Sequence, residues 1–247
     1  MAAPSIFSAA KRQVVERLKQ TAIQPSPFPH VYVEDIFPAE FYAAIQHHRL
    51  PDEAYRRLSD TGRVSGDAYK TRLCLMHDDV SAAADAGRAF WRDFFATFDD
   101  RAFAAVWLEL FGPIIRERLL DDFPDIGDGM RMRGEFLLMR DLPTYALGPH
   151  TDSPSKIVSV LFYLPADDSH AELGTSLYLP RDPGFVCRGG PHHPFAGFNR
   201  VDTMPYRPNT LFAFPKTKRS FHGVEPLPSN PYRRDLLLFD IRSDVGA

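Results

Sequence analysis

The sequence predicts a mainly β protein in which a helical N-terminal half packs on a C-terminal antiparallel sandwich or barrel. Up to residue 120 the apolar side chains recur at helical spacing, and after Gly129 they fall into short runs separated by Pro, Gly, Asn or Asp. Because no helical pattern separates the later runs, a parallel βαβ sheet is disfavoured. We expect one domain over residues 1–247, mostly helical over 1–125 and strand-rich over 126–247.

The first elements follow from the spacing of apolar residues and from proline. An amphipathic helix is expected over 8–20, where Val14, Val15 and Leu18 lie opposite the basic residues. The prolines within 24–30 end this helix, since each removes a backbone donor and restricts φ. A short strand is expected over 31–37, after which Pro38 opens a helix that runs to about His48.

Residues 81–120 again show helical spacing, now with aromatic side chains four positions apart. Gly112 and Pro113 should divide this stretch into consecutive helices. Core packing explains such a stripe more readily than a ligand site does, so we expect these helices to support a sheet. The stripe consists of Phe90, Phe94, Phe98, Phe103, Trp107 and Phe111.

The strands expected after Gly129 are short apolar runs with a turn signal in nearly every gap. They lie at 136–139, 157–164, 176–179, 210–214 and 236–241.

Composition narrows the possible functions. The chain of 247 residues is 44% hydrophobic and 25% charged, as in globular proteins, and its net charge of -3 offers no basic surface for nucleic acid. No run approaches the roughly 18 apolar residues of a membrane span, and the N-terminus lacks the pattern of a secretory signal. Cys74 and Cys187 are too few for a disulfide scaffold or a CxxC zinc site. We therefore expect a cytoplasmic protein that binds neither nucleic acid nor membrane.

Three residues form a candidate metal site. His150 and Asp152 stand just before the long apolar run at 157–164, and in an extended segment they would point to the same side. His222 lies in a second expected strand, over 220–224. Two imidazoles and one carboxylate on one face of a metal leave positions open for other ligands, as in the facial triad of non-heme Fe(II) sites.

Two arginines follow this second histidine. Arg233 and Arg234 enter an otherwise apolar run, where a buried guanidinium is costly unless it meets an anion. The planar guanidinium group suits a carboxylate bound through both oxygens. Because neighbouring strand residues alternate, only one of the two can face inward. A surface position at the strand end would also explain both.

Together these motifs resemble the Fe(II)/2-oxoglutarate-dependent oxygenases of the prolyl-hydroxylase-like bacterial kind. The shared pattern is His150-x-Asp152, then His222, then an arginine in the last core strand. The segments 145–152, 162–178 and 208–224, and the expected first strand within 27–37, are also similar. The resemblance covers most of residues 27–242 and is weakest over 50–125.

The resemblance implies a double-stranded β-helix, or jelly roll, with Fe(II) bound by His150, Asp152 and His222 in its mouth. It implies that 2-oxoglutarate chelates the iron and that its far carboxylate pairs with an arginine. The family pattern is Arg-x-Ser, and here Asp235 stands in place of the serine, so Arg233 is the first choice and Arg234 the second.

The implied reaction uses O2 to convert 2-oxoglutarate to succinate and CO2 and to hydroxylate an unactivated C–H bond. The carboxylate of Asp152 favours hydroxylation over halogenation, while desaturation and ring closure stay open. Two alternatives use the same three residues: a zinc hydrolase with a metal-bound water, and a non-catalytic jelly-roll binding module.

The substrate is left open between a small molecule and a residue of a peptide or carrier-bound chain. The polar segment 59–72 fits either an active-site lid or an ordinary surface loop. Several basic residues fit either an anionic ligand or a solvated surface, namely Lys70, Arg72, Arg131 and Arg133. The pair His192 and His193 is kept as a further possible metal ligand.

Overall fold

The computed structural model of the chain describes residues 5–64, 66, 69–81, 85–124 and 130–244. Its α-helices are α1 (Ile6–Lys19), α2 (Ala39–His47), α3 (His77–Ser81), α4 (Ala86–Phe98), α5 (Arg101–Leu110) and α6 (Gly112–Asp122). Its strands are β1 (Val31–Val33), β2 (Arg56–Arg57), β3 (Arg72–Met76), β4 (Met132–Asp141), β5 (Leu147–His150), β6 (Lys156–Tyr163), β7 (Thr175–Pro180), β8 (Phe198–Met204), β9 (Thr210–Pro215), β10 (His222–Val224) and β11 (Arg234–Ser243).

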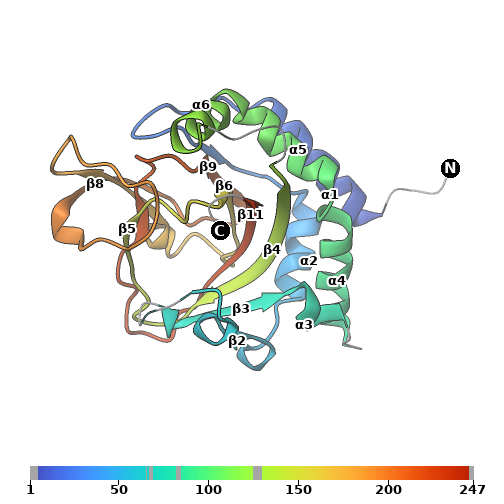
Figure 1. Cartoon of the computed structure of the whole chain (residues 1–247). Helices are drawn as coiled ribbons and strands as arrows, with labels where there is room; N and C mark the ends of the chain where they lie inside the picture. The colour runs from blue at the N-terminus through green and yellow to red at the C-terminus, as the bar shows by residue number, and fades with distance from the viewer. Residues whose placement is uncertain (1–4, 65, 67–68, 82–84, 125–129, 245–247) are drawn as a thin grey trace.

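The strands form two antiparallel sheets that face each other across a central space (Figure 1). The larger sheet has the order β1-β9-β6-β11-β4-β3-β2, and the smaller one has the order β5-β10-β7-β8. From β4 to β11 the chain crosses repeatedly from one sheet to the other, and β4 and β11 are neighbours. This is the strand arrangement of a jelly roll. The predicted fold class is confirmed.

Alternation along the strands divides the core into two parts. On β4, Phe136 and Leu138 belong to the cluster that includes the helices, whereas Leu137 and Met139 belong to the cluster between the two sheets. Successive strand residues point to opposite faces, so the larger sheet is buried on both sides. The space between the sheets is therefore lined by every second residue of β4, β6 and β11.

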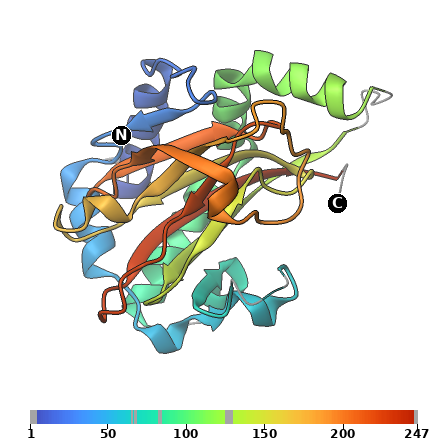
Figure 2. The same ribbon diagram turned by 90° about the vertical axis from the view of Figure 1, so that its left-hand side faces the viewer.

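The helices cover the outer face of the larger sheet. In Figure 2, which is turned so that the smaller sheet faces the reader, most of them lie behind the strands. The whole predicted aromatic stripe is buried there, from Phe90 to Phe111, and Phe136 and Phe239 of the sheet stack on one another beside it. The prediction that these helices support a sheet is confirmed.

Local sequence explains where the helices begin and end. Asp100 caps α5 by accepting a hydrogen bond from the backbone N–H of Phe103, so the expected long helical stretch is divided there as well as at Gly112. α2 begins directly after Pro38, as expected. No helix among the described residues is long and apolar enough to cross a bilayer. The predicted change of architecture at 125–126 lies outside the described residues.

Four strands were not predicted. β2 and β3 fall within or beside the segment interpreted as a lid or loop, β5 lies where the chain before Asp152 was expected only to be extended, and β8 has charged and polar residues on most positions. β3 pairs with β4 over Arg72–Met76, so Arg72 is part of the larger sheet. β2, β5 and β8 are edge strands in which polar or turn-forming residues obscure the alternation of apolar residues. β3 lies between β4 and β2, and its short apolar run directly follows the polar segment that was interpreted as a lid or loop.

Candidate metal centre

The two predicted histidine ligands face each other across a strand pair. His150 ends β5 and His222 begins β10, and they are direct partners in the antiparallel ladder, with ring centroids 4.3 Å apart. Close strand pairing requires a glycine here, because a Cβ added to Gly223 would lie 2.4 Å from the carbonyl oxygen of Leu147. The sheet thus places both imidazoles at the same edge of the central space.

Asp152 joins them through a turn. β5 ends at His150, and Asp152 has a φ of 64°, in the left-handed region that aspartate tolerates better than most residues. The extended-strand argument for this pair was therefore wrong, although the two side chains do meet. Asp152 Oδ1 lies 3.6 Å from His150 Nε2, and Oδ2 lies 3.7 Å from His222 Nε2.

The hydrogen bonds leave the histidine Nε2 atoms available. His150 Nδ1 lies 3.0 Å from the carbonyl oxygen of Gly148, and His222 Nδ1 lies 2.9 Å from that of Ser220. A carbonyl accepts only, so each Nδ1 carries the proton and each Nε2 presents a lone pair. Among the described residues, this is the one group of three whose ligand atoms all lie within 4.8 Å. All three side chains are buried.

The carboxylate of Asp152 is oriented from the opposite sheet. Ser159 on β6 donates a hydrogen bond of 2.8 Å to Asp152 Oδ2, and Lys156 Nζ lies 3.1 Å from Oδ1. Lys156 Nζ also lies 3.1 Å from Asp240 Oδ1 on β11. The metal centre is thus supported by residues of both sheets, which holds its three ligands in one geometry.

The electrostatic surroundings favour neutral histidines and an ionised aspartate. Burial, with a contribution from His150, lowers the pKa of His222 to about 3, so this imidazole is neutral at neutral pH. Burial is the largest single influence on the Asp152 carboxyl and raises its pKa, but the Lys156 ammonium, His222 and His150 together outweigh burial and hold that pKa well below its usual value. Neutral imidazoles and an ionised carboxylate are the forms that bind a divalent metal.

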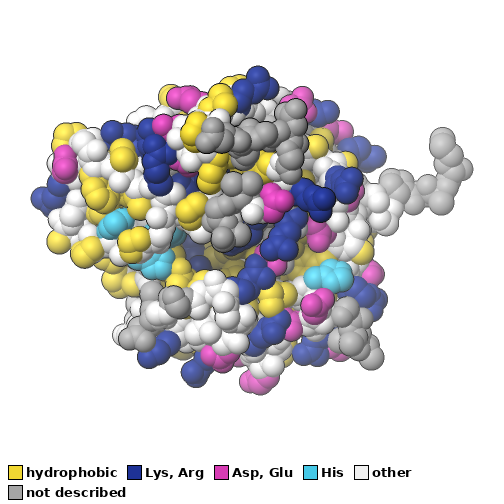
Figure 3. Space-filling model, in the orientation of Figure 1, with side chains coloured by type: hydrophobic (Ala, Val, Ile, Leu, Met, Phe, Trp, Pro, Cys, Tyr) yellow, Lys and Arg dark blue, Asp and Glu magenta, His cyan; other side chains and the backbone are white. Residues whose placement is uncertain are grey.

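A cavity of about 580 Å³ opens beside this centre. Its wall includes His150 and Asp152, Leu137 and Met139 of β4, and Arg72 of β3. Figure 3, which views the molecule along the space between the sheets, shows a hollow on this face with Lys and Arg side chains beside it. The cavity has the size of a small-molecule site.

Arg234, the second of the predicted cosubstrate arginines, points into the space between the sheets. It is fully buried, and its Nη1 donates a hydrogen bond of 2.6 Å to Asp141 Oδ2. Arg72 binds the same carboxylate, with Nε 2.5 Å from Asp141 Oδ1. Two guanidinium groups thus share one carboxylate, which leaves one positive charge over. Beside them, the buried hydroxyl of Tyr145 has no hydrogen-bond partner among the described residues.

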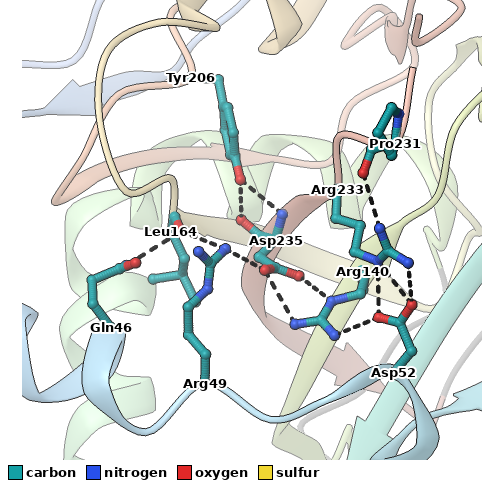
Figure 4. Close-up of polar contacts among 9 residues, drawn as sticks. All are labelled: Gln46, Arg49, Asp52, Arg140, Leu164, Tyr206, Pro231, Arg233 and Asp235. Carbon is teal, nitrogen blue, oxygen red and sulfur yellow. Dashed lines mark hydrogen bonds and ion pairs between the residues drawn. The ribbon is translucent and has the colours of Figure 1, made fainter. Parts of the chain in front are cut away.

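Arg233 points the other way. Its side chain is 43% exposed and its Nη2 lies 2.6 Å from Asp52 Oδ2, in the charged cluster of Figure 4. Asp235 belongs to this cluster too, because it accepts hydrogen bonds from Arg140 and Arg49. The strand register therefore turns Arg234 inward, opposite to the preference drawn from the Arg-x-Ser pattern. Which arginine meets the cosubstrate stays a prediction.

His192 lies beside the centre without joining it. Its ring centroid is 4.7 Å from that of His150, and its Nε2 forms a hydrogen bond of 2.9 Å with the hydroxyl of Tyr69. The segment interpreted as either a lid or a surface loop supplies Tyr69 and other residues to the cavity wall, while its residues 65, 67 and 68 lie outside the described part of the chain. The lid interpretation stays a prediction.

Sequence reasoning missed several members of this site. Ser159, Lys156 and Asp141 were treated only as strand or loop residues, and Arg72 was not separated from the surface cations. The single polar residue inside the otherwise apolar run 157–162 is the signal that could have found Ser159. Arg72 gives no such signal, because its neighbours did not read as a strand.

Comparisons with known proteins give structural matches alone. No protein-family model matches the sequence, and no curated protein is similar to it. A prolyl-4-hydroxylase from Pseudomonas putida has 16% identity and a TM-score of 0.49, covering 94% of this chain and 98% of its own. A prolyl hydroxylase from Trichoplax adhaerens, in complex with a hypoxia inducible factor peptide fragment, has 12% identity and a TM-score of 0.45, covering 96% of this chain and 90% of its own.

A third match is a non-heme alpha-ketoglutarate-dependent epimerase from nogalamycin biosynthesis. It has 14% identity and a TM-score of 0.46, and the match covers 94% of this chain and 82% of its own. The matches are to enzymes of the kind that the motifs resemble. All three TM-scores are below 0.5, and the residues of this chain are what indicate its function. Those residues define a jelly-roll protein with a two-histidine, one-carboxylate centre.

Proposed function

We propose that this chain is an Fe(II)- and 2-oxoglutarate-dependent dioxygenase that hydroxylates an unactivated C–H bond and releases succinate and CO2. The observation that carries the proposal is the buried set of His150, Asp152 and His222, with both Nε2 atoms free and the carboxylate ionised. The substrate would be a small molecule or a residue of a peptide or carrier-bound chain.

The donor set fits Fe(II). Two imidazole nitrogens and one carboxylate oxygen on one side of an ion leave its other side to the cosubstrate and O2. When bound, Fe(II) with 2-oxoglutarate and O2 supplies the oxidising chemistry. The protein supplies the geometry: β5 and β10 set the histidines opposite each other, and Ser159 with Lys156 holds Asp152 in place.

The inner arginines fit the far carboxylate of 2-oxoglutarate. Arg72 lines the cavity of the metal centre, and Arg72 and Arg234 together have one charge more than Asp141 neutralises. A second carboxylate beside them would balance this charge and give the Tyr145 hydroxyl an acceptor. We assign this role to Arg234 and Arg72, and the outward position of Arg233 argues against it for that residue.

The zinc hydrolase and the binding module account for fewer of these residues than the dioxygenase does. A zinc hydrolase needs the three ligands and a water, and it has no need of a second cation site in the same interior. A non-catalytic binding module does not need a neutral imidazole and an ionised carboxylate held side by side. The arginine pair behind the metal centre is thus the feature that favours the dioxygenase.

The test measures the succinate formed from 2-oxoglutarate in air, in the presence of Fe(II) or of Zn(II). Mass spectrometry detects the succinate. We expect turnover with Fe(II) only, and none in Asp152→Ala, which should keep the thermal stability of the metal-free protein. A metabolite screen for stimulated succinate release and for products heavier by one oxygen would then find the substrate. Hydrolysis supported by Zn(II), or unchanged turnover in Asp152→Ala, would overturn the proposal.

A further inference from the structure

The inner faces of the strands carry residues in successive layers. On β4 and β11 the directly opposed pairs are Asp141 with Arg234, then Met139 with Leu236, Leu137 with Leu238, Glu135 with Asp240, and Arg133 with Arg242. The third strand, β6, continues the last two layers with Ser159 and Lys156. The layer of Ser159 is the one that contacts the metal ligand Asp152. A basic row thus lies one layer further toward the mouth.

This basic row consists of Arg133, Arg242 and Lys156, on three adjacent strands. Arg133 and Arg242 are direct cross-strand partners, and like charges in such positions destabilise a sheet. All three line the cavity of the metal centre, at its outer end. A row of like charges at the entrance of a cavity lowers the stability of the fold unless an anion lies among them. We therefore expect an anionic ligand to bind at this row.

The charges nearby do not neutralise the row. Lys156 is paired with Asp152 and Asp240, and Glu135 forms an ion pair with Arg63. Arg242 reaches only Asp240, with Nη2 3.1 Å from Oδ2, and its buried Nε has no partner among the described residues. Arg133 is exposed and has no side-chain partner in the described part of the chain. The mouth therefore has four cations for three carboxylates, one of which is the metal ligand.

Arg133 also lies at the junction of two cavities. It lines both the cavity of the metal centre and a surface cavity of about 940 Å³ bounded by α5 and the ends of β4 and β11. A ligand that extended from one cavity into the other would lie against this residue. The donor groups of Arg133 and Arg242 can hold a planar or tetrahedral oxyanion through several hydrogen bonds.

We propose that the substrate carries an oxyanion, a carboxylate or a phosphate, and that Arg133 and Arg242 bind it at the mouth of the metal-centre cavity. This inference rests on the proposed function for the reaction, but the binding site itself is defined by the basic row. The arginines act as specificity residues, because they hold the substrate at a distance from the metal without taking part in the reaction.

The test uses three probes with the same phenyl ring: benzoate, phenyl phosphate and the neutral benzamide, which matches benzoate in shape. Each is titrated anaerobically into protein saturated with Mn(II) and 2-oxoglutarate, and binding is followed by the broadening of the probe's NMR signals by Mn(II). We expect an oxyanion probe to bind at least about tenfold more tightly than benzamide, a difference of about 1.4 kcal/mol. The preference between benzoate and phenyl phosphate identifies the kind of oxyanion.

The variants are Arg133→Ala and Arg242→Ala, with Arg57→Ala as the matched control. Arg57 is an exposed strand arginine whose partner Leu73 has its side chain on the sheet face opposite to Arg72. We expect each mouth variant to weaken oxyanion binding at least about tenfold and to leave benzamide unchanged, and the control to change neither. Arg242→Lys, which keeps the charge, should keep part of the affinity and serves if Arg242→Ala does not fold.

Equal binding of benzamide and both oxyanions, or equal effects of the control and the mouth variants, would overturn this inference. A separate titration with 2-oxoglutarate distinguishes the two proposals. If 2-oxoglutarate binds and the oxyanion probes do not, the mouth site alone fails. If 2-oxoglutarate does not bind in the presence of Mn(II), the proposed function fails, whatever the probes show.

Discussion

Arg234 and Asp141 lie directly opposite each other on β11 and β4, and their fully buried side chains form an ion pair of 2.6 Å. Arg72 binds the same carboxylate from β3, at the inner wall of the metal-centre cavity. Breaking a buried ion pair of this kind costs stability. Because two guanidinium groups share one carboxylate here, the group has an excess positive charge that an anion could balance. The relationship leads to the first prediction.

Arg234→Ala is expected to weaken 2-oxoglutarate binding at least about a hundredfold, since removing one member of a buried charged pair costs about 3–5 kcal/mol. Arg233→Ala is expected to change it less than about threefold, because this side chain is outside the barrel and paired with Asp52. Dissociation constants are measured anaerobically with Mn(II). Arg234→Lys provides a second variant should Arg234→Ala not fold. A large loss in Arg233→Ala with none in Arg234→Ala or Arg234→Lys would contradict the assignment.

The second prediction concerns the support of the metal ligand. Ser159→Ala removes the hydroxyl that donates to Asp152 Oδ2, and outer-shell changes of this kind typically weaken metal binding about 10–100-fold. Mn(II) affinity is measured by titration followed by electron paramagnetic resonance. Ser176→Ala is the control, because Ser176 is also buried but bonds Thr203 on β8. Equal affinities in the two variants would show that the Ser159 hydrogen bond does not orient the ligand.

The third prediction is a loss of stability of the metal-free protein in mild acid. The pKa of His222 is about 3 in the folded protein because the ring is buried, and about 6.5 in the unfolded chain. Below about pH 6.5 the unfolded state binds a proton that the folded state does not, so stability falls with pH by up to about 1.4 kcal/mol per unit. Burial lowers the pKa of His192 to about 4, which acts in the same direction.

This slope is measured by urea unfolding between about pH 6 and 5 in the presence of a chelator, where most carboxylates stay ionised. His222→Asn removes the group that takes up a proton in the unfolded state. The free energy of unfolding of this variant should therefore change less steeply with pH than that of the wild type, by up to about 1.4 kcal/mol per pH unit. His77→Asn, at a histidine whose side chain is 55% exposed, is the control for the substitution itself. If His222→Asn and wild type have the same slope, His222 is not held neutral by burial.

The fourth prediction separates the charged cluster of Figure 4 from the metal centre. Asp235 accepts hydrogen bonds from Arg140 and Arg49 on the outer side of the larger sheet, where the side chains of Asp235 and Arg140 are 8% and 6% exposed. Asp235→Ala should therefore lower the free energy of unfolding by about 3–5 kcal/mol. Asp52→Ala should lower it by no more than about 1 kcal/mol, because Asp52 is 31% exposed.

Both variants should bind 2-oxoglutarate with nearly the wild-type dissociation constant, since neither residue faces the space between the sheets. Urea unfolding and the anaerobic titration are made on the same samples. A Kd raised more than about tenfold in a folded Asp235→Ala protein would place this cluster in the cosubstrate site and would reopen the choice between the two arginines.

Local patterns were sufficient for the main elements and for the three candidate metal ligands. The aromatic spacing of 90–111 predicted helices because an aromatic residue every fourth position makes one continuous face, and that face is buried against the larger sheet. The apolar runs predicted five of the strands for a similar reason. His150, Asp152 and His222 could be chosen from the sequence because their residue types and neighbouring strand signals are both local properties.

Only the tertiary structure shows in which direction each of these side chains points and which residues it contacts. Whether Arg233 or Arg234 points inward depends on the register of β11 against β4, and a shift of one residue exchanges the two faces of a strand. Asp152 meets the histidines through a left-handed turn, which a strand pattern does not contain. Arg72 and the row of Arg133, Arg242 and Lys156 are brought together by strands distant in sequence. The sequence by itself therefore determined the three residues of the candidate metal centre, and only the pairing of the sheets decided which charges surround it.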